Sequence, residues 1–220
     1  MEFKEVKLHT NKFDELHTFY SAVLGFPIEE KSKTHITLKA GKSRLTFVRS
    51  DQSSFYHFAF NLAVDHFDEA KKMIKQLVKL NEEDGNDEIY FSYSNARAFY
   101  FLDPAGNVVE FIERRNYSEK IKGGFSVQKI LDIGEVSFTS KCVNEHASQL
   151  IKAGISVRDG DHLEEDQLNF MGEQGRYLLV GPPGRKWLFS HQNAESHPLH
   201  IHCASGLVLE LTPNGELEIR

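Results

Sequence analysis

The sequence predicts an α+β protein built from a repeated unit of one strand, one helix and further strands. Two observations carry this prediction. Strand, helix and strands follow one another twice within the first 115 residues, and a third, partial copy comes later. Apolar residues change between a period of two and a period near 3.6 within each copy, as strands and helices require.

The first unit begins with a half-buried strand. Residues 3–10 alternate apolar and polar side chains. Residues 13–24 place apolar side chains at helical spacing, and Gly25 follows where a left-handed C-terminal cap would lie. Two short strands are expected next, at residues 35–39 and 44–48.

The second unit repeats this order. A strand is expected at residues 57–62 and a helix at residues 67–80. Residues 103–107, Asp-Pro-Ala-Gly-Asn, have the composition of a tight turn. Three strands are expected after the helix, at residues 89–93, 98–102 and 108–112.

A third copy follows a polar stretch, but it has no fourth copy to pair with. The expected organisation is a two-unit domain at residues 1–115, a linker at 116–126 and a third unit at 127–220. The third unit ends in a hairpin around Ser205-Gly206. Its other expected elements are a strand at 136–140, a helix at 144–153, and strands at 168–171, 175–180 and 186–189.

Composition excludes several classes of protein. The 220 residues are 40% hydrophobic and include 17 Phe, 7 Tyr and 1 Trp, enough for a packed core. The net charge of −6 argues against a nucleic-acid binder, and no apolar run approaches the roughly 20 residues of a membrane span. Two cysteines without a CxxC motif argue against a disulfide framework, and no signal peptide is apparent. We expect a cytoplasmic protein that binds a small molecule, with no nucleic-acid or membrane partner.

Three segments resemble the vicinal oxygen chelate superfamily, which includes glyoxalase I, extradiol dioxygenases and bleomycin resistance proteins. They are His57-Phe58-Ala59-Phe60, Phe19-Tyr20-x-x-Val23-Leu24-Gly25-Phe26, and the run from Asp103 to Phe111. The resemblance implies paired βαβββ modules that form a cupped mixed sheet with helices outside, plus a third partial module. The superfamily contains lyases, dioxygenases and plain binding proteins, so the resemblance predicts the fold better than the function.

The resemblance also implies a site inside the cup. His57 and Glu110 match metal-ligand positions, while Glu5 stands where the superfamily has its first-strand histidine. Arg44 stands at a fourth ligand position and departs from the pattern. Strand alternation then places further polar side chains on the faces of the cup, giving Lys7, His9, Arg44, Thr46 and Asn61 as the expected ligand pocket. Glu135 is equivalent to His57 in the third unit, but it has no acidic partner on a final strand, so no metal site is expected there.

Two accounts of this cup stay open. Glu5, His57 and Glu110 could hold a divalent metal such as Mn, Fe, Mg, Ni or Zn, with Glu110 also serving as a catalytic base. Alternatively, Arg44 pairs with Glu5 or Glu110, and the protein binds a small molecule without any metal.

The first account predicts a metal-dependent lyase, isomerase or dioxygenase acting on a small vicinal-oxygen substrate, and the second a resistance-type binding protein. Because a lone third unit would expose a sheet edge, a homodimer is also expected.

Overall fold

Two complete strand, helix and strand units form the first half of the chain in the computed structural model, which describes residues 1–220. The helix of the first unit continues as a π-helical turn, η1 (Phe19–Val23), before Gly25 at φ +82° ends it. The first unit consists of β1 (Phe3–Thr10), α1 (Phe13–Thr18), β2 (Ile28–Lys31), β3 (His35–Ala40) and β4 (Ser43–Arg49). The second consists of β5 (His57–Leu62), α2 (Phe67–Leu77), β6 (Ile89–Phe91), β7 (Ala96–Leu102) and β8 (Val108–Arg114).

The second half of the chain contains the third unit and three C-terminal strands. The hairpin predicted around Ser205-Gly206 is confirmed, but the strand predicted at 186–189 is wrong because this segment forms a loop. No helix is long and apolar enough to cross a membrane. The elements are η2 (Val127–Lys129), β9 (Asp132–Thr139), α3 (Val143–Lys152), η3 (Arg158–Gly160), β10 (Asn169–Glu173), β11 (Arg176–Gly181), β12 (Leu199–Cys203), β13 (Val208–Leu211) and β14 (Leu217–Ile219).

The strands form two seven-stranded sheets, and each sheet combines strands from both halves of the chain. Sheet A has the order β14-β13-β12-β1-β4-β3-β2, and sheet B has the order β10-β11-β9-β5-β8-β7-β6. The first unit joins the C-terminal strands where β1 pairs with β12, and the second unit joins the third where β5 pairs with β9. The linker expected at 116–126 therefore does not separate the sheets. The homodimer stays a prediction.

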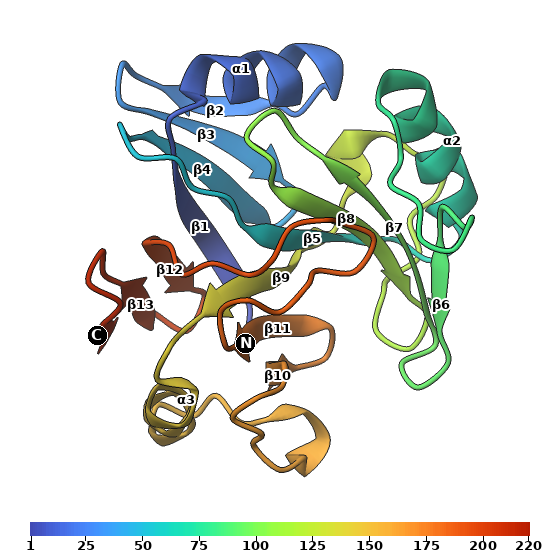
Figure 1. Cartoon of the computed structure of the whole chain (residues 1–220). Helices are drawn as coiled ribbons and strands as arrows, with labels where there is room; N and C mark the ends of the chain where they lie inside the picture. The colour runs from blue at the N-terminus through green and yellow to red at the C-terminus, as the bar shows by residue number, and fades with distance from the viewer.

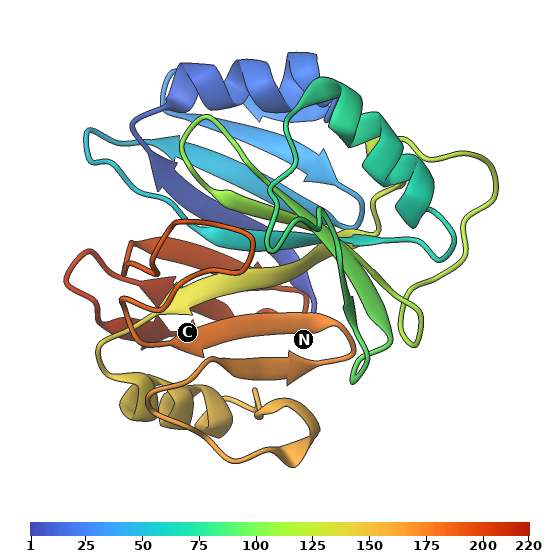
Figure 2. The same cartoon turned by 45° about the vertical axis from the view of Figure 1, so that its right-hand side comes forward.

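The larger of two apolar clusters joins strands of both sheets to the buried sides of α1, α2 and α3. Strand alternation directs Val6 and Leu8 of β1 and Phe58 and Phe60 of β5 into this core. The ring of Phe60 on β5 lies 5.1 Å from that of Phe26, which follows η1, so the first and second units are in direct contact. Figure 2 shows the helices of these two units, blue and green, both at the top of the view. Figure 1 shows α1 and α2 along one side of the molecule and α3 on the opposite side. The other face of sheet B carries the smaller apolar cluster, which includes Ala59 and Trp187, and His57 packs on this Trp187.

A close approach ties sheet A to the chain just before β9. The turn between β3 and β4 places Gly41 at φ +62°, where a Cβ atom would lie 2.1 Å from the carbonyl oxygen of Leu131. The backbone N–H of Lys42 donates to the same oxygen at 2.8 Å. The hydroxyl of Ser43 donates to the carbonyl oxygen of Phe3 and accepts from the backbone N–H of Ile133. These contacts hold the start of β9 against sheet A, and the pairing of β9 with β5 sets which of its side chains face the site.

Candidate metal centre

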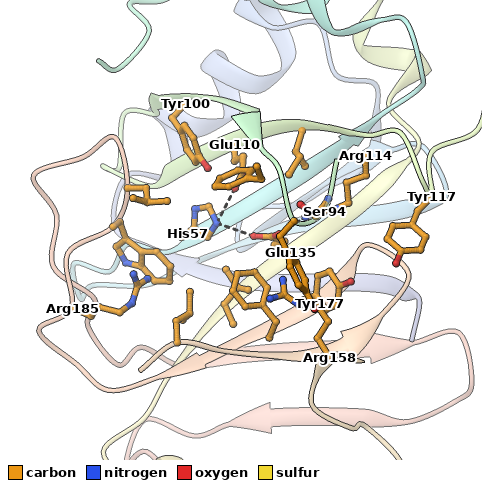
Figure 3. Close-up of a pocket in the computed structure, with 18 residues that line it drawn as sticks. His57, Ser94, Tyr100, Glu110, Arg114, Tyr117, Glu135, Arg158, Tyr177 and Arg185 are labelled. Atoms are coloured by element: carbon orange, nitrogen blue, oxygen red, sulfur yellow. Dashed lines mark hydrogen bonds and ion pairs between the residues drawn. The ribbon is translucent and has the colours of Figure 1, made fainter. Parts of the chain in front are cut away.

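Three buried side chains meet on three neighbouring strands of sheet B (Figure 3). His57 lies on β5, Glu110 on β8 and Glu135 on β9. Ala59 is paired in register with both glutamates, and its small side chain leaves space between them. The Nε2 atom of His57 lies 3.4 Å from Oε2 of Glu110 and 3.5 Å from Oε2 of Glu135. Ligand atoms of all three residues lie within 4.8 Å of one another.

Contacts around the ring fix the orientation of His57. Its Nδ1 lies 3.0 Å from the carbonyl oxygen of Val108, so Nδ1–H donates to the backbone and Nε2 faces the two glutamates. The indole of Trp187 stacks on the imidazole with 4.7 Å between ring centroids. Holding one ring nitrogen on a carbonyl is how proteins orient a histidine that binds a metal through the other nitrogen.

The turn between β7 and β8 sets the position of Glu110 relative to His57. The Asp103 carboxylate accepts hydrogen bonds from the backbone N–H groups of Ala105 and Asn107, from the Asn107 amide and from the Tyr20 hydroxyl. The Asn107 side chain in turn accepts from the backbone N–H of Tyr56 at 2.7 Å. Because Tyr56 immediately precedes His57, this network aligns the start of β5 with β8.

Glu135 is held from its other side by a buried arginine. The guanidinium of Arg114 donates one hydrogen bond to Glu135 and another to the side-chain oxygen of Asn61. The Asn61 amide donates to Asp132 at 2.7 Å and to the carbonyl oxygen of Gly175 at 3.1 Å. Asn61 therefore positions Arg114.

Burial and mutual charge shift the protonation of all three residues. Burial together with the charge of Glu135 raises the pKa of Glu110. Burial also opposes ionisation of Glu135, but Arg114 and His57 outweigh it and lower the pKa of that carboxyl. Burial opposes a charged imidazole as well, yet the two carboxylates outweigh it and raise the pKa of His57 to about 9. Without a cation between them, these groups neutralise one another.

The donor set also fits a divalent metal ion. Ligands at roughly 2.0–2.2 Å from one ion are about 3.0–3.6 Å apart, and both measured separations fall in this interval. A direct charge-assisted N–H···O bond is shorter, typically about 2.7–2.9 Å. One imidazole and two carboxylates form a hard donor set, which suits Mn, Fe(II) or Mg better than Cu.

The cluster lies in the wall of a cavity of about 330 Å³. Aromatic side chains make up much of the remaining wall, so the cavity suits a flat, largely apolar molecule. These are Phe91, Tyr93, Tyr100, Tyr117, Phe170, Tyr177 and Trp187.

The structure brings His57 and Glu110 together as expected but does not bring Glu5 to them. Glu5 lies on sheet A, where its carboxylate accepts from the Thr46 hydroxyl at 2.8 Å and lies 3.6 Å from the Lys7 ammonium. The expected pocket residues Lys7, His9, Arg44 and Thr46 are on β1 and β4 of this same sheet. The reason is strand pairing: the second unit forms its cup with the third unit, and the first unit pairs with the C-terminal strands.

Sequence reasoning missed Glu135 and Arg114 as members of the site. Glu135 was recognisable as the residue equivalent to His57, but a site in the third unit was not expected because no carboxylate follows on a later strand of that unit. The second unit supplies that carboxylate as Glu110. Arg114 pairs with a glutamate in the way expected of Arg44, and it does so from the end of β8.

Comparison with known proteins supports the architecture. The family model of the toxoflavin-degrading enzyme matches residues 133–185, and no curated protein sequence matches the chain. A proposed dioxygenase from Bacillus subtilis is 15% identical, with a TM-score of 0.56 over 82% of this chain and 63% of that chain.

Two shorter structures match about half of the chain. Lactoylglutathione lyase from Agrobacterium tumefaciens is 21% identical, with a TM-score of 0.45 over 53% of this chain and 96% of that chain. A glyoxalase/bleomycin resistance protein/dioxygenase from Alicyclobacillus acidocaldarius is 24% identical, with a TM-score of 0.40 over 52% of this chain and 92% of that chain.

The chain has the fold of the vicinal oxygen chelate superfamily, the class of glyoxalases, bleomycin resistance proteins and dioxygenases. The candidate site of this chain is formed by one histidine and two glutamates from the second and third units.

Proposed function

We propose that this protein is a metal-dependent enzyme of the vicinal oxygen chelate type, with His57, Glu110 and Glu135 as the metal ligands. The observation that carries the proposal is the spacing of the donor atoms, with Nε2 of His57 at 3.4 and 3.5 Å from the two carboxylates. The substrate is a small molecule with two neighbouring oxygens. The reaction is a lyase, isomerase or dioxygenase reaction.

The protein's own residues would bind and orient the substrate. A divalent ion at this position supplies Lewis-acid stabilisation of negative charge on substrate oxygens. The aromatic wall stacks on the substrate and excludes water from the site. Glu135 is held by Arg114, whereas Glu110 has no guanidinium partner, so Glu110 is the carboxylate that would take a proton from the substrate.

A second candidate function is binding of a small molecule without a metal. The pairing of Arg114 with Glu135 favours it, because this arginine already neutralises one of the two carboxylates. A protonated His57 would then neutralise the other. In this case the cavity sequesters its ligand and performs no chemistry.

Metal binding separates the two candidates. We would remove metal from the protein with EDTA and titrate it with Mn²⁺, measuring bound metal by elemental analysis and affinity by calorimetry. The enzyme proposal predicts one Mn²⁺ per chain, and loss of at least about tenfold in affinity in Glu110→Gln and Glu135→Gln.

The matched control is Glu5→Gln. Glu5 lies on the first strand of its unit, as His57 does, but belongs to sheet A, so this variant should bind Mn²⁺ as the wild type does. Absence of stoichiometric metal in the wild type would favour the binding protein. Equal losses in Glu5→Gln and Glu110→Gln would place the metal elsewhere.

A further inference from the structure

Three arginines line the cavity, and two of them are engaged by carboxylates of the protein. Arg114 binds Glu135. Arg158 lies 3.8 Å from Asp159 and contacts the rings of Tyr93 and Phe170, although its buried Nε has no hydrogen-bond acceptor. The third, Arg185, forms no ion pair with any carboxylate of the chain.

Arg185 is held in place without having its hydrogen-bonding capacity satisfied. Its guanidinium carbon lies 4.2 Å from the ring centroid of Trp187, and Nη1 donates to the carbonyl oxygen of Lys186 at 3.1 Å. The Nε and Nη2 atoms are buried, and no protein group accepts a hydrogen bond from either. Burial also lowers the pKa of this guanidinium. Buried donors on a charged group are costly when they lack an acceptor, which makes Arg185 a preformed site for an anion.

The charges of the cavity wall also favour an anionic occupant. The wall contains two carboxylates, Glu110 and Glu135, and three guanidinium groups. A divalent ion on the two carboxylates would leave further positive charge in the cavity. Trp187 contacts both the Arg185 guanidinium and the His57 imidazole, so its indole connects the candidate metal centre to the arginine.

We infer that Arg185 binds a carboxylate or another oxyanion of the substrate, so that the molecule taken up by this cavity is a planar anion. The inference rests on the proposed function in that it takes the occupant of the cavity to be the substrate. Arg185 acts as a specificity-determining residue, because its N–H groups can donate hydrogen bonds to two oxygens of one planar group.

Two probes that differ in charge test this inference. We would titrate the protein with 3,4-dihydroxybenzoate and with 3,4-dihydroxybenzamide by calorimetry, once with Mn²⁺ and once with EDTA. Both probes have neighbouring oxygens, and only the first has a carboxylate. Trp187 is the single tryptophan of the chain, so its fluorescence reports binding in this cavity independently.

The wild type should bind the carboxylate at least about tenfold more tightly than the amide, since a charge-assisted bidentate contact is lost in the amide. This ratio should fall to about one in Arg185→Gln and be partly retained in Arg185→Lys. The control is Arg49→Gln, because Arg49 also covers an aromatic ring, Phe13 at 4.2 Å, but lies on sheet A.

The inference is overturned if neither probe binds, if the wild type binds both equally, or if the ratio survives in Arg185→Gln. A thermal melt of each variant shows that it is folded. If the charge ratio holds but Mn²⁺ changes neither affinity, the metal proposal fails while the anion site stands. If Mn²⁺ increases the affinity for both probes equally and the protein binds both with the same affinity, the anion site fails while the metal proposal stands.

Discussion

Replacing Arg114 with glutamine should destabilise the metal-free protein strongly, because it leaves Glu135 buried without its guanidinium. Arg114 is itself buried and bonds to both Glu135 and Asn61. Removing one member of a buried ion pair costs about 3–5 kcal/mol. In a chain of this length, each kcal/mol lowers the melting temperature by about 2–4 °C, so we expect a decrease of about 6–20 °C.

Added Mn²⁺ should reverse part of this loss, since a cation between His57, Glu110 and Glu135 would compensate the unpaired carboxylate. The assay is thermal unfolding followed by circular dichroism, with EDTA and with Mn²⁺. The control is Arg97→Gln, which removes half-exposed ion pairs to Asp68 and Glu88 and should cost no more than about 1 kcal/mol. A loss in Arg114→Gln no larger than that of Arg97→Gln would refute the role given to Arg114. An Mn²⁺ shift no larger than that of the wild type would refute compensation by the metal.

Three further predictions concern the framework of the site. Asn107→Ala should lower the free energy of unfolding, measured in urea, by about 2–4 kcal/mol, because the buried N–H of Tyr56 loses its acceptor and a hydrogen bond to Asp103 is lost. The control Asn116→Ala, at an exposed contact with Asn95, should have little effect. Gly41→Ala should lower the free energy of unfolding by more than about 2 kcal/mol, because its Cβ would meet two backbone carbonyl oxygens. The control Gly206→Ala, at a positive φ with no atom near the new Cβ, should lower it by about 1 kcal/mol. Burial raises the pKa of Asp103 from 3.8 to about 6. The folded protein therefore holds this proton more tightly than the unfolded chain, and the resulting stabilisation is full below about pH 4. It is lost as the pH rises through 6, which lowers the free energy of unfolding by about 3 kcal/mol. Melting curves between pH 4 and pH 7 check this, and a pH slope unchanged in Asp103→Asn would contradict it.

Local sequence patterns were sufficient for most elements and for part of the site. Alternation placed His57 and Glu110 on the same sheet face, and both side chains indeed meet there. The residues of the turn at 103–107 predicted a tight connection, and the Asp103 network provides it. These features depend on contacts within one unit, where neighbours in the sequence are neighbours in space.

The partnership of the units was decided only by the tertiary structure. Every unit presents a similar first strand, so the sequence alone does not distinguish pairing of β5 with β1 from pairing of β5 with β9. Contacts between distant segments accompany that pairing, among them the approach of Gly41 to Leu131 just before β9. Because β5 pairs with β9, the candidate site contains Glu135 where the sequence predicted Glu5, and Arg114 where it predicted Arg44. Sequence periodicity therefore determined which side chains face a cup, and long-range strand pairing determined which of those side chains share one.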